Sequence, residues 1–242
     1  MKKNILVAIL SLTLILSACA ARIVRGSGDV VSEMRDVSGF DEVDVCCGME
    51  LILSQGDEIS LEIEAEDNIL AEIESRVVGD SLRIEYRDQY PETGYRPTRP
   101  IRIYLTIAEI RAVEISGGGE LDAFTIETDS LDLRLSGGSE AEIDSLIAEE
   151  FNLHISGGGD ASVSGQVVEQ NIHLSGGSSY EAGNLESSEA GLDVSGGGDA
   201  EVWVTDKLVV NASGGSSISY YGELQLTSNT SGGSTVKSLG SK

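Results

Sequence analysis

Seven Ser-Gly-Gly triplets recur along the second half of the chain, and they constrain its fold more than any other feature. They begin at Ser116, Ser136, Ser156, Ser175, Ser195, Ser213 and Ser231, at spacings of 18 to 20 residues. Self-similarity at a fixed period of this length is typical of a solenoid, in which each repeat forms one coil. Since the triplets hold much of the glycine in a chain with 29 Gly among 242 residues, the glycine indicates regular corners with positive φ.

The residues around each triplet alternate as they do in a half-buried strand. The positions one and three residues before the Ser are apolar in nearly every repeat, as Ile155 and Leu153 are, whereas the position between them is polar, as in His154. A further apolar column lies five residues after the Ser, for example at Ala161. This period of two predicts strands with one face in a core.

A repeat of about 20 residues matches one coil of a three-sided β-helix whose coils stack about 4.8 Å apart. A coil of about 40 residues with two glycine corners remains open, because the third residue after the Ser alternates at first between Gly and Ser. The apolar columns align at every unit, however, and this favours the shorter coil. The predicted fold is therefore an all-β, single-stranded β-helix with about 20 residues per coil.

The region before the triplets lacks them but keeps the alternation of strands. Strands are expected at Val43–Val45, Glu50–Leu53, Ile59–Ala65, Ser81–Tyr86 and Ile101–Ile107, with a turn of helix within Asp67–Arg76. Residues 39–110 are thus predicted to form a β-rich N-terminal cap and the first coils, and residues 111–237 the repeat coils, of one domain spanning 39–237. Polar residues replace the apolar pattern at Thr227–Ser231, as suits a capping coil.

The N-terminus has the pattern of a secreted lipoprotein. Two lysines precede an apolar run over residues 5–16, which is too short for a membrane span of about 20 residues. The following Leu16-Ser17-Ala18-Cys19 resembles the lipobox of bacterial lipoproteins. It predicts a signal peptide over residues 1–18 and a lipid on Cys19. The alternative is an ordinary signal peptide that ends near a cysteine.

A lipid on Cys19 would hold the protein to a membrane of the bacterial cell envelope. Ala20 follows this cysteine, and a residue other than Asp at that position favours the outer membrane over the inner one. Residues 19–38 are expected to form a tether between the lipid and the folded domain.

The charge of the chain excludes one class of partner and suggests a metal. With 41 Asp and Glu against 16 Lys and Arg, the formal net charge is -25, which argues against nucleic acid. In stacked coils the acids would form two outward columns, one of Glu120, Glu140, Asp160 and Asp199, the other of Asp122, Glu142, Glu181 and Glu201. Ca²⁺ would relieve their repulsion. The alternative is a hydrated acidic face that takes no cofactor.

Two other groups of residues are candidate binding sites. His154 and His173 occupy equivalent positions in consecutive repeats, so they are expected side by side, either by chance or to bind a metal or titrate together. The loop from Tyr90 to Pro100 is the one basic, aromatic-bearing stretch, and its Tyr90, Tyr95, Arg96 and Arg99 would suit a glycan or an acidic protein. The alternative is a long connection whose arginines pair with nearby acids.

Cys46 and Cys47 are adjacent, and neighbouring side chains on a strand point to opposite faces. A bond between them would be strained, so we expect two free thiols, one buried and one partly exposed.

Several segments of the sequence resemble a known family. The run Phe40-Asp41-Glu42-Val43-Asp44-Val45, a segment of paired strands and the Ser-Gly-Gly-Gly-Asp/Glu units are similar to the head GIN domain family of auto-transporter adhesins. The resemblance covers roughly residues 38–237, and Tyr221-Gly222 also matches. It implies a right-handed β-helix and a bacterial protein that is often a lipoprotein. Cys46-Cys47-Gly48 departs from the small residues and Gly that the family tends to have there.

The sequence favours binding over catalysis. It has no Gly-x-Ser-x-Gly nucleophile motif, the turns between repeats are short, and only four basic residues follow residue 112. We therefore expect a non-enzymatic, surface-anchored binding or adhesion module with a protein or glycan ligand. The alternatives are a structural or signalling partner of another envelope protein and a carbohydrate-active β-helix enzyme.

Overall fold

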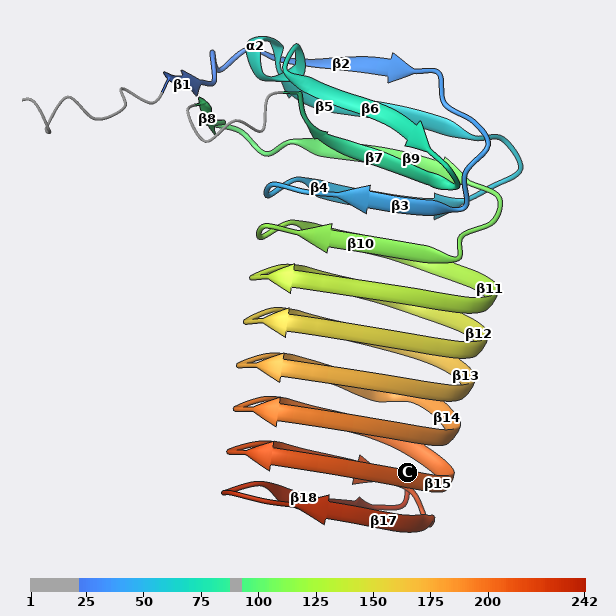
Figure 1. The fold of residues 1–242 in the computed structure, drawn as a ribbon. Coiled ribbons are helices and arrows are strands. Elements are labelled where there is room, and N and C mark those ends of the chain that lie inside the picture. Colours follow the sequence, from blue (N-terminus) through green and yellow to red (C-terminus); the bar gives the residue numbers. More distant parts are fainter. Residues whose placement is uncertain (1–21, 88–92) are drawn as a thin grey trace, which may run out of the picture.

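The chain folds into a β-solenoid with a β-rich cap at its N-terminal end (Figure 1). A computed structural model describes residues 22–87 and 93–242, so the predicted signal peptide over residues 1–18 and Cys19 lie outside the described residues. About 73% of the described residues are in strands and 2% in helix, and about six turns stack roughly 20 residues apart in sequence. The predicted fold is confirmed, and so is the coil of about 20 residues.

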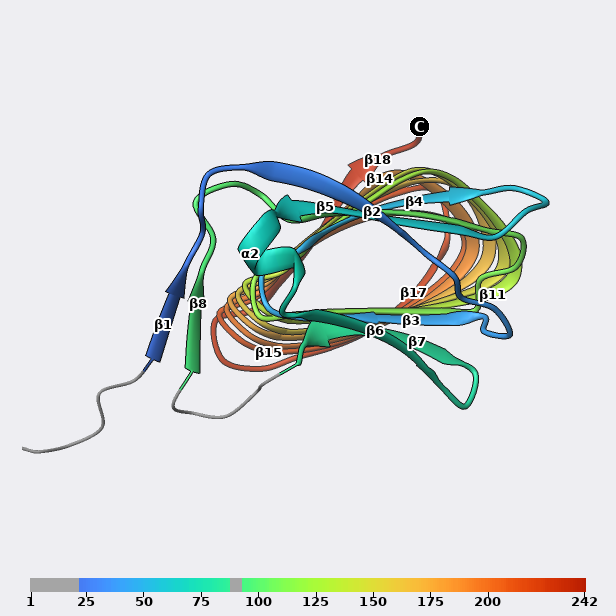
Figure 2. The ribbon, with the colours of Figure 1, turned by 90° about the horizontal axis from the view of Figure 1, so that it is seen from above.

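Five long strands each wrap one coil. They are β11 (Glu120–Gly137), β12 (Glu140–Gly157), β13 (Asp160–Gly176), β14 (Ser179–Gly196) and β15 (Asp199–Gly214). Each pairs in parallel with the next, and the triplet serines stack in register from coil to coil. In Figure 1 the strand segments nearest the viewer, which end at the triplets, run leftward. In Figure 2 the chain turns clockwise as it moves away from the viewer, so the solenoid is right-handed.

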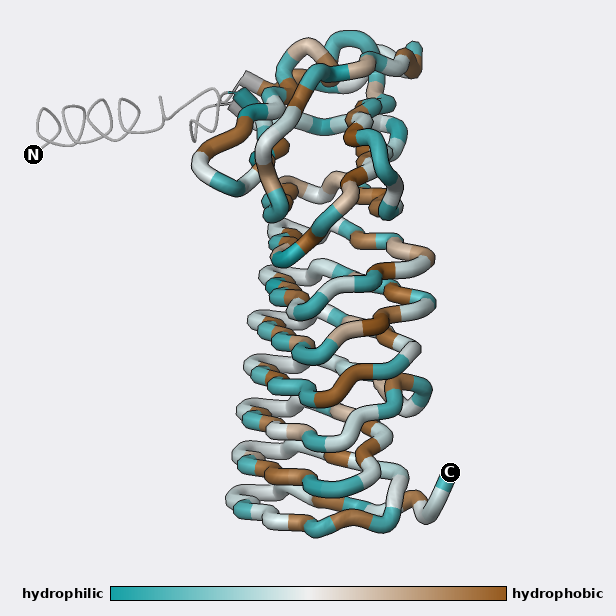
Figure 3. Tube along the Cα trace, turned by 90° about the vertical axis from the view of Figure 1, so that its right-hand side faces the viewer, coloured by the Kyte–Doolittle hydropathy of each residue, from teal (hydrophilic) through white to brown (hydrophobic). Residues whose placement is uncertain are grey.

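Each coil has three paired segments. In β11 the ladder to β12 runs over 120–123, 125–128 and 130–137, and it skips Phe124 and Asp129. The third side, which is the short 125–128 segment in β11, is the least regular. The pairings β12–β13, β13–β14 and β14–β15 all shift register where this segment begins. Phe124, Ile147 and Val168 are 77%, 48% and 55% exposed near this side, which faces the viewer in Figure 3.

The core fills the inside of the coils with stacked apolar side chains. Leu133, Leu153, Ile172, Leu192 and Val210, three residues before successive serines, are all 1% exposed or less. Burying a side chain of this kind contributes about 1.5–3 kcal/mol, and the alternation repeats this gain in every coil. The strict period of the sequence therefore follows from one core shared by stacked coils.

The glycine pair of each triplet forms the corner of the coil that follows the triplet serine. The first Gly of each pair has positive φ, for example +98° at Gly176 and +99° at Gly196. The second Gly donates its N–H to the first Gly of the preceding coil, as Gly197 N does to Gly176 O at 2.8 Å. A corner with a positive φ and carbonyl groups in such close approach requires glycine.

The N-terminal region combines unfinished coils with antiparallel strands that cover the end of the solenoid (Figure 2). Its strands are β3 (Glu42–Val45), β4 (Glu50–Gln55), β7 (Ser81–Tyr86), β9 (Arg102–Ile107) and β10 (Ala112–Ser116), with β2 (Val30–Arg35), β5 (Ser60–Glu66) and β6 (Ile73–Val78). β10 continues the parallel stack through β3 to β7, whereas β2–β5, β5–β9 and β6–β7 pair antiparallel. The five predicted strands are confirmed to within two residues at each end, and the expected turn of helix is α2 (Asp67–Leu70).

The expected tether is in large part folded. Residues 22–25 form β1 (Arg22–Arg25), which pairs with β8 (Thr93–Arg96), and residues 30–35 form β2 on β5. Sequence reasoning missed these strands because each is short and finds its partner more than 25 residues away. The opposite end of the rod carries β16 (Ser217–Tyr221), β17 (Gln225–Thr230) and β18 (Thr235–Gly240). Among the described residues no helix is long and apolar enough to cross a membrane.

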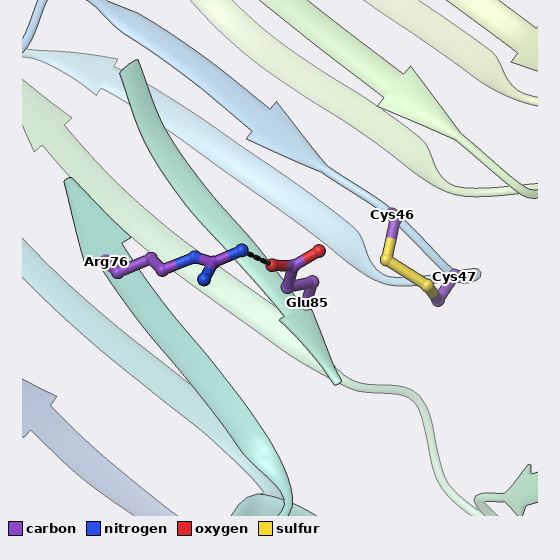
Figure 4. The surroundings of a disulfide bond; sticks show 4 residues. All are labelled: Cys46, Cys47, Arg76 and Glu85. Atoms are coloured by element: carbon purple, nitrogen blue, oxygen red, sulfur yellow. Dashed lines mark hydrogen bonds and ion pairs between the residues drawn. A yellow bond between two sulfur atoms is a disulfide. The ribbon is translucent and has the colours of Figure 1, made fainter. Parts of the chain in front are cut away.

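Cys46 and Cys47 form a disulfide, so the prediction of two free thiols is wrong (Figure 4). The prediction assumed extended backbone at both residues, but Cys47 has a φ of +72° and its N–H bonds to Ser116 O at 3.0 Å. The chain therefore leaves the strand at Cys47, and the alternation of side chains ends there. Cys46-Cys47-Gly48 is in fact the first glycine-type corner, stacked on the one that begins at Ser116.

Candidate binding surfaces on the solenoid

A polar groove runs along the front side of the solenoid next to the glycine corners. Its outer wall is one column of side chains, two residues before each Ser: Glu114, Arg134, His154, His173, Asp193, Asn211 and Asn229. The triplet serines form the other wall, and the groove encloses about 640 Å³. We call this the polar groove. Its floor is the parallel sheet itself, so its side chains project at the regular spacing of the coils.

The two histidines lie side by side in this groove, as the sequence predicts. Their ring centroids are 4.7 Å apart, and His173 Nε2 is 3.5 Å from Asp193 Oδ2. Asn211 donates to Asp193 Oδ1 at 2.8 Å, and Asn229 donates to Asn211 Oδ1 at 3.0 Å. The column thus contains a hydrogen-bonded ladder over three coils, from Asp193 to Asn229, and His173 lies next to its first member.

The environment of His154 favours its neutral form. Partial burial lowers the pKa of His154 from its ordinary value of 6.5, and the positive charges of His173 and Arg134 lower it further, whereas Asp132 opposes them. A second proton on the pair would therefore place two like charges on adjacent coils. The folded structure therefore disfavours protonation of His154 relative to the unfolded chain.

This arrangement predicts a stability that falls as the pH drops. The unfolded chain protonates His154 near pH 6.5 but the folded chain does so only at a lower pH, so the free energy of unfolding declines across that interval. Because the rings are exposed, the loss is expected to stay below about 1 kcal/mol, or roughly 1–3 °C in Tm. Thermal unfolding at pH 7.5 and pH 5 should show a smaller loss for H154N/H173N than for the natural chain. Equal losses in both proteins would rule out a role for the pair.

The predicted carboxylate columns lie on the second side of the coil. Register places Glu120, Glu140 and Asp160 next to one another, with Ser179 between Asp160 and Asp199. In the neighbouring column Asp122 lies beside Glu142, Ser162 interrupts the acids, and Glu181 lies beside Glu201 in the same register.

Glu120, in the first of these columns, lies among several like charges. Partial burial raises the pKa of Glu120, and the negative charges of Asp122, Glu50, Glu140 and Glu142 raise it further. Within residues 22–87 and 93–242, no three His, Cys, Asp or Glu side chains converge as ligands of one metal ion. Ca²⁺ binding by the two columns therefore stays a prediction that requires the side chains to move.

The structure places the described members of the basic, aromatic loop in two different environments. Tyr90 lies outside the described residues, and Tyr95 is half-buried, stacked on Tyr86 with ring centroids 4.0 Å apart and planes 10° from parallel. Burial, and then the neighbouring Tyr95, raises the pKa of Tyr86 to about 12. Tyr95 therefore packs β8 onto the cap, whereas Arg96 and Arg99 remain exposed.

Sequence reasoning noted the polar column but did not recognise that it forms a groove. The signal was available in the column itself. Its members change from acid to Arg, His, Asp and Asn along the rod, whereas a column needed only for solubility can repeat one charged residue type.

Comparison with known proteins gives a family and several similar folds. A family model described as "Putative auto-transporter adhesin, head GIN domain" matches residues 39–223. The chain is similar to a crystal structure of a putative adhesin from Bacteroides fragilis, with a TM-score of 0.78 and 21% identity over 89% of this chain and 100% of the other. A putative lipid binding protein from Parabacteroides distasonis gives 0.75 and 17% over 90% and 100%.

A putative adhesin from Parabacteroides distasonis is also similar, with a TM-score of 0.72 and 21% identity over 90% of this chain and 100% of the other. At such identities the likeness establishes the fold alone. No match was found among curated protein sequences.

Proposed function

The chain belongs to the head GIN domain family, and from this we propose that it is a lipid-anchored adhesion module of the bacterial envelope that binds its ligand along the polar groove. The family and the similar structures carry names of adhesins and of a lipid-binding protein. A fold by itself does not specify a ligand, so the proposal depends on the groove.

The observation that carries the proposal is the ladder of unlike polar side chains in the groove. His173, Asp193 and Asn211 are held by mutual contacts of 2.8–3.5 Å yet remain exposed. Such groups present donors and acceptors in fixed positions at little entropic cost, which favours binding of an extended polar ligand. A glycan chain or an extended peptide lying along the rod would meet one such group at every coil.

The sequence on the N-terminal side of the folded domain supports the lipid anchor. The lipobox-like Leu16-Ser17-Ala18-Cys19 predicts acylation of Cys19, and the outer membrane is the expected location. An anchored rod whose coils stack along one axis would carry the groove away from the membrane surface.

Binding is tested with the mature protein on glycan arrays and on immobilised surface proteins. H173A/N211A is expected to weaken binding of any hit by about tenfold, because it removes two members of the column. The matched control E127A/Q166A changes two exposed residues on the third side and should bind normally. Binding that survives H173A/N211A, or no binding to either panel, would contradict the proposal.

The same screen separates the other candidate functions. Release of sugar from a bound glycan would identify a carbohydrate-active enzyme. One stoichiometric companion from envelope extracts, without glycan binding, would identify a partner of another envelope protein.

A further inference from the structure

A small sheet beside the cap carries unpaired positive charge on an acidic molecule. β1 pairs in parallel with β8 in a two-stranded sheet that is separate from the 16-stranded sheet of the solenoid and cap. Figures 1 and 2 show it beyond the edge of the cap, at the end of the rod opposite the last coils. We call residues 22–25 and 93–99 the basic ribbon, because they include four arginines and no acidic residue.

Within the part of the chain that the structure describes, three arginines of the basic ribbon lack the ion pairs that five other arginines of the N-terminal region form. Arg25, Arg96 and Arg99 are exposed, and none of them forms an ion pair with another described residue. By contrast, Arg35, Arg76, Arg83, Arg102 and Arg111 each lie within ion-pair distance of a carboxylate. Ile23, between the arginines of β1, is 62% exposed.

The two sequence segments that contain the basic ribbon have a net positive charge even when the neighbouring loop is counted. Residues 20–28 and 87–100 contain five Arg against Asp88 and Glu92, which gives a net charge of +3. The whole chain has a net charge of -25. The basic ribbon is therefore a local exception at one end of an acidic rod.

Hydrogen bonds fix the basic ribbon to the cap. Glu66, which is 1% exposed, accepts hydrogen bonds from Gly28 N at 2.7 Å, Thr98 N at 2.7 Å and the Thr98 hydroxyl at 2.6 Å. The Thr98 hydroxyl, and then backbone N–H groups, lower the pKa of Glu66 against the effect of burial. Asn68 also donates to Arg25 O at 2.8 Å. Because these hydrogen bonds attach the basic ribbon to the cap, binding of the ribbon to a surface would orient the whole rod.

The position of the basic ribbon in the sequence limits its distance from a membrane. Arg22 follows Cys19 by three residues, and three residues reach at most about 11 Å when fully extended. The Debye length at physiological ionic strength is about 8 Å. A lipid on Cys19 would therefore hold Arg22, at the start of the basic ribbon, close to the headgroups and bring the rest of the ribbon near the membrane surface.

We propose that the basic ribbon is a second membrane contact that binds the phosphate groups of anionic phospholipids. The arginines supply the electrostatic attraction, and Ile23 supplies apolar surface at the interface. The same anionic surface repels the acidic solenoid, so the rod stands away from the membrane with its groove accessible. The proposal relies on the lipid anchor of the proposed function for its geometry, but not for its chemistry.

The test compares two kinds of vesicle that carry the mature, lipidated protein. The vesicles consist of phosphatidylcholine alone or with about 30% phosphatidylglycerol, and hydrogen exchange of amides 22–28 and 93–99 is followed by mass spectrometry. Exchange is expected to be about fivefold slower on the anionic vesicles, and this difference should vanish at about 0.5 M NaCl. R25Q/R96Q/R99Q should abolish the difference, whereas K207Q/K237Q/K242Q, which removes the same charge from the solenoid, should retain it.

The outcomes separate the basic ribbon from the anchor. The intact mass of the purified protein shows whether Cys19 is acylated, which tests the proposed function alone. Protein with C19A, sedimented with the two kinds of vesicle, should partition about tenfold better onto the anionic ones, and R25Q/R96Q/R99Q should remove this preference. Equal partition and equal exchange on both vesicle types would overturn the proposal, as would loss of the effect in K207Q/K237Q/K242Q.

Discussion

Replacing Gly196 by Ala is expected to destabilise the solenoid by about 3–5 kcal/mol, among the largest effects of any single methyl group in this chain. The residue has a φ of +99°, and a Cβ there would lie 2.5 Å from Gly176 O and 3.1 Å from Gly176 N. Both neighbours are backbone atoms of the preceding coil, and Gly176 O also accepts the hydrogen bond from Gly197 N. The methyl group would therefore push two coils apart.

The adjacent glycine provides a matched control. Gly197 carries no positive φ, and a Cβ built on it meets nothing within 4 Å. Thermal or urea unfolding should show a fall in Tm of roughly 6–20 °C for G196A and a change within about 2 °C for G197A. Similar values for the two variants would show that the corner has no need of glycine at its first position.

The corners also explain why so much of this fold is predictable. A solenoid coil contacts only its neighbours, so the same local requirements recur in each repeat and appear in the sequence as a period. Gly157, Gly176 and Gly196 all have positive φ and all face a carbonyl of the coil before. The apolar columns, the register of the carboxylates and the contact of His154 with His173 follow directly from that period.

The features that were not predicted are those that depend on single, non-repeated contacts. β1 and β8 pair across about 70 residues, and Tyr95 turned out to pack on Tyr86. The periodicity of the sequence does not predict such pairings, because two segments that meet after a long loop need share no local sequence pattern. Cys47 was misjudged for a related reason, since its positive φ is visible only when the corner beginning at Ser116 stacks on it.

A buried polar side chain inside the coil was also not predicted, and it leads to the second large effect. Gln170 is 0% exposed and takes a core position between Phe151 and Ala190 of the adjacent coils. Its Oε1 accepts a hydrogen bond from the Tyr180 hydroxyl at 2.9 Å, and its Nε2 donates to Ser187 Oγ at 2.8 Å. Burial raises the pKa of Tyr180 well above its usual value, so the hydroxyl stays protonated and remains a donor.

Q170L is expected to lower the free energy of unfolding by about 2–3 kcal/mol, because it leaves the Tyr180 hydroxyl buried without an acceptor. Ser187 is affected less, since its hydroxyl still donates to Trp203 O at 3.1 Å. The fall in Tm should be roughly 4–12 °C in thermal unfolding.

Y180F distinguishes the lost hydrogen bond from a simple change of shape. Alone it should cost about 1–2 kcal/mol, since Gln170 Oε1 then lacks its donor. In Q170L/Y180F neither partner is left unpaired, so the double variant should be more stable than Q170L alone, with a coupling energy of about 1–2 kcal/mol in a double-mutant cycle. Strictly additive losses would mean that the two side chains do not act as a pair, and that Gln170 is tolerated in the core for its volume alone.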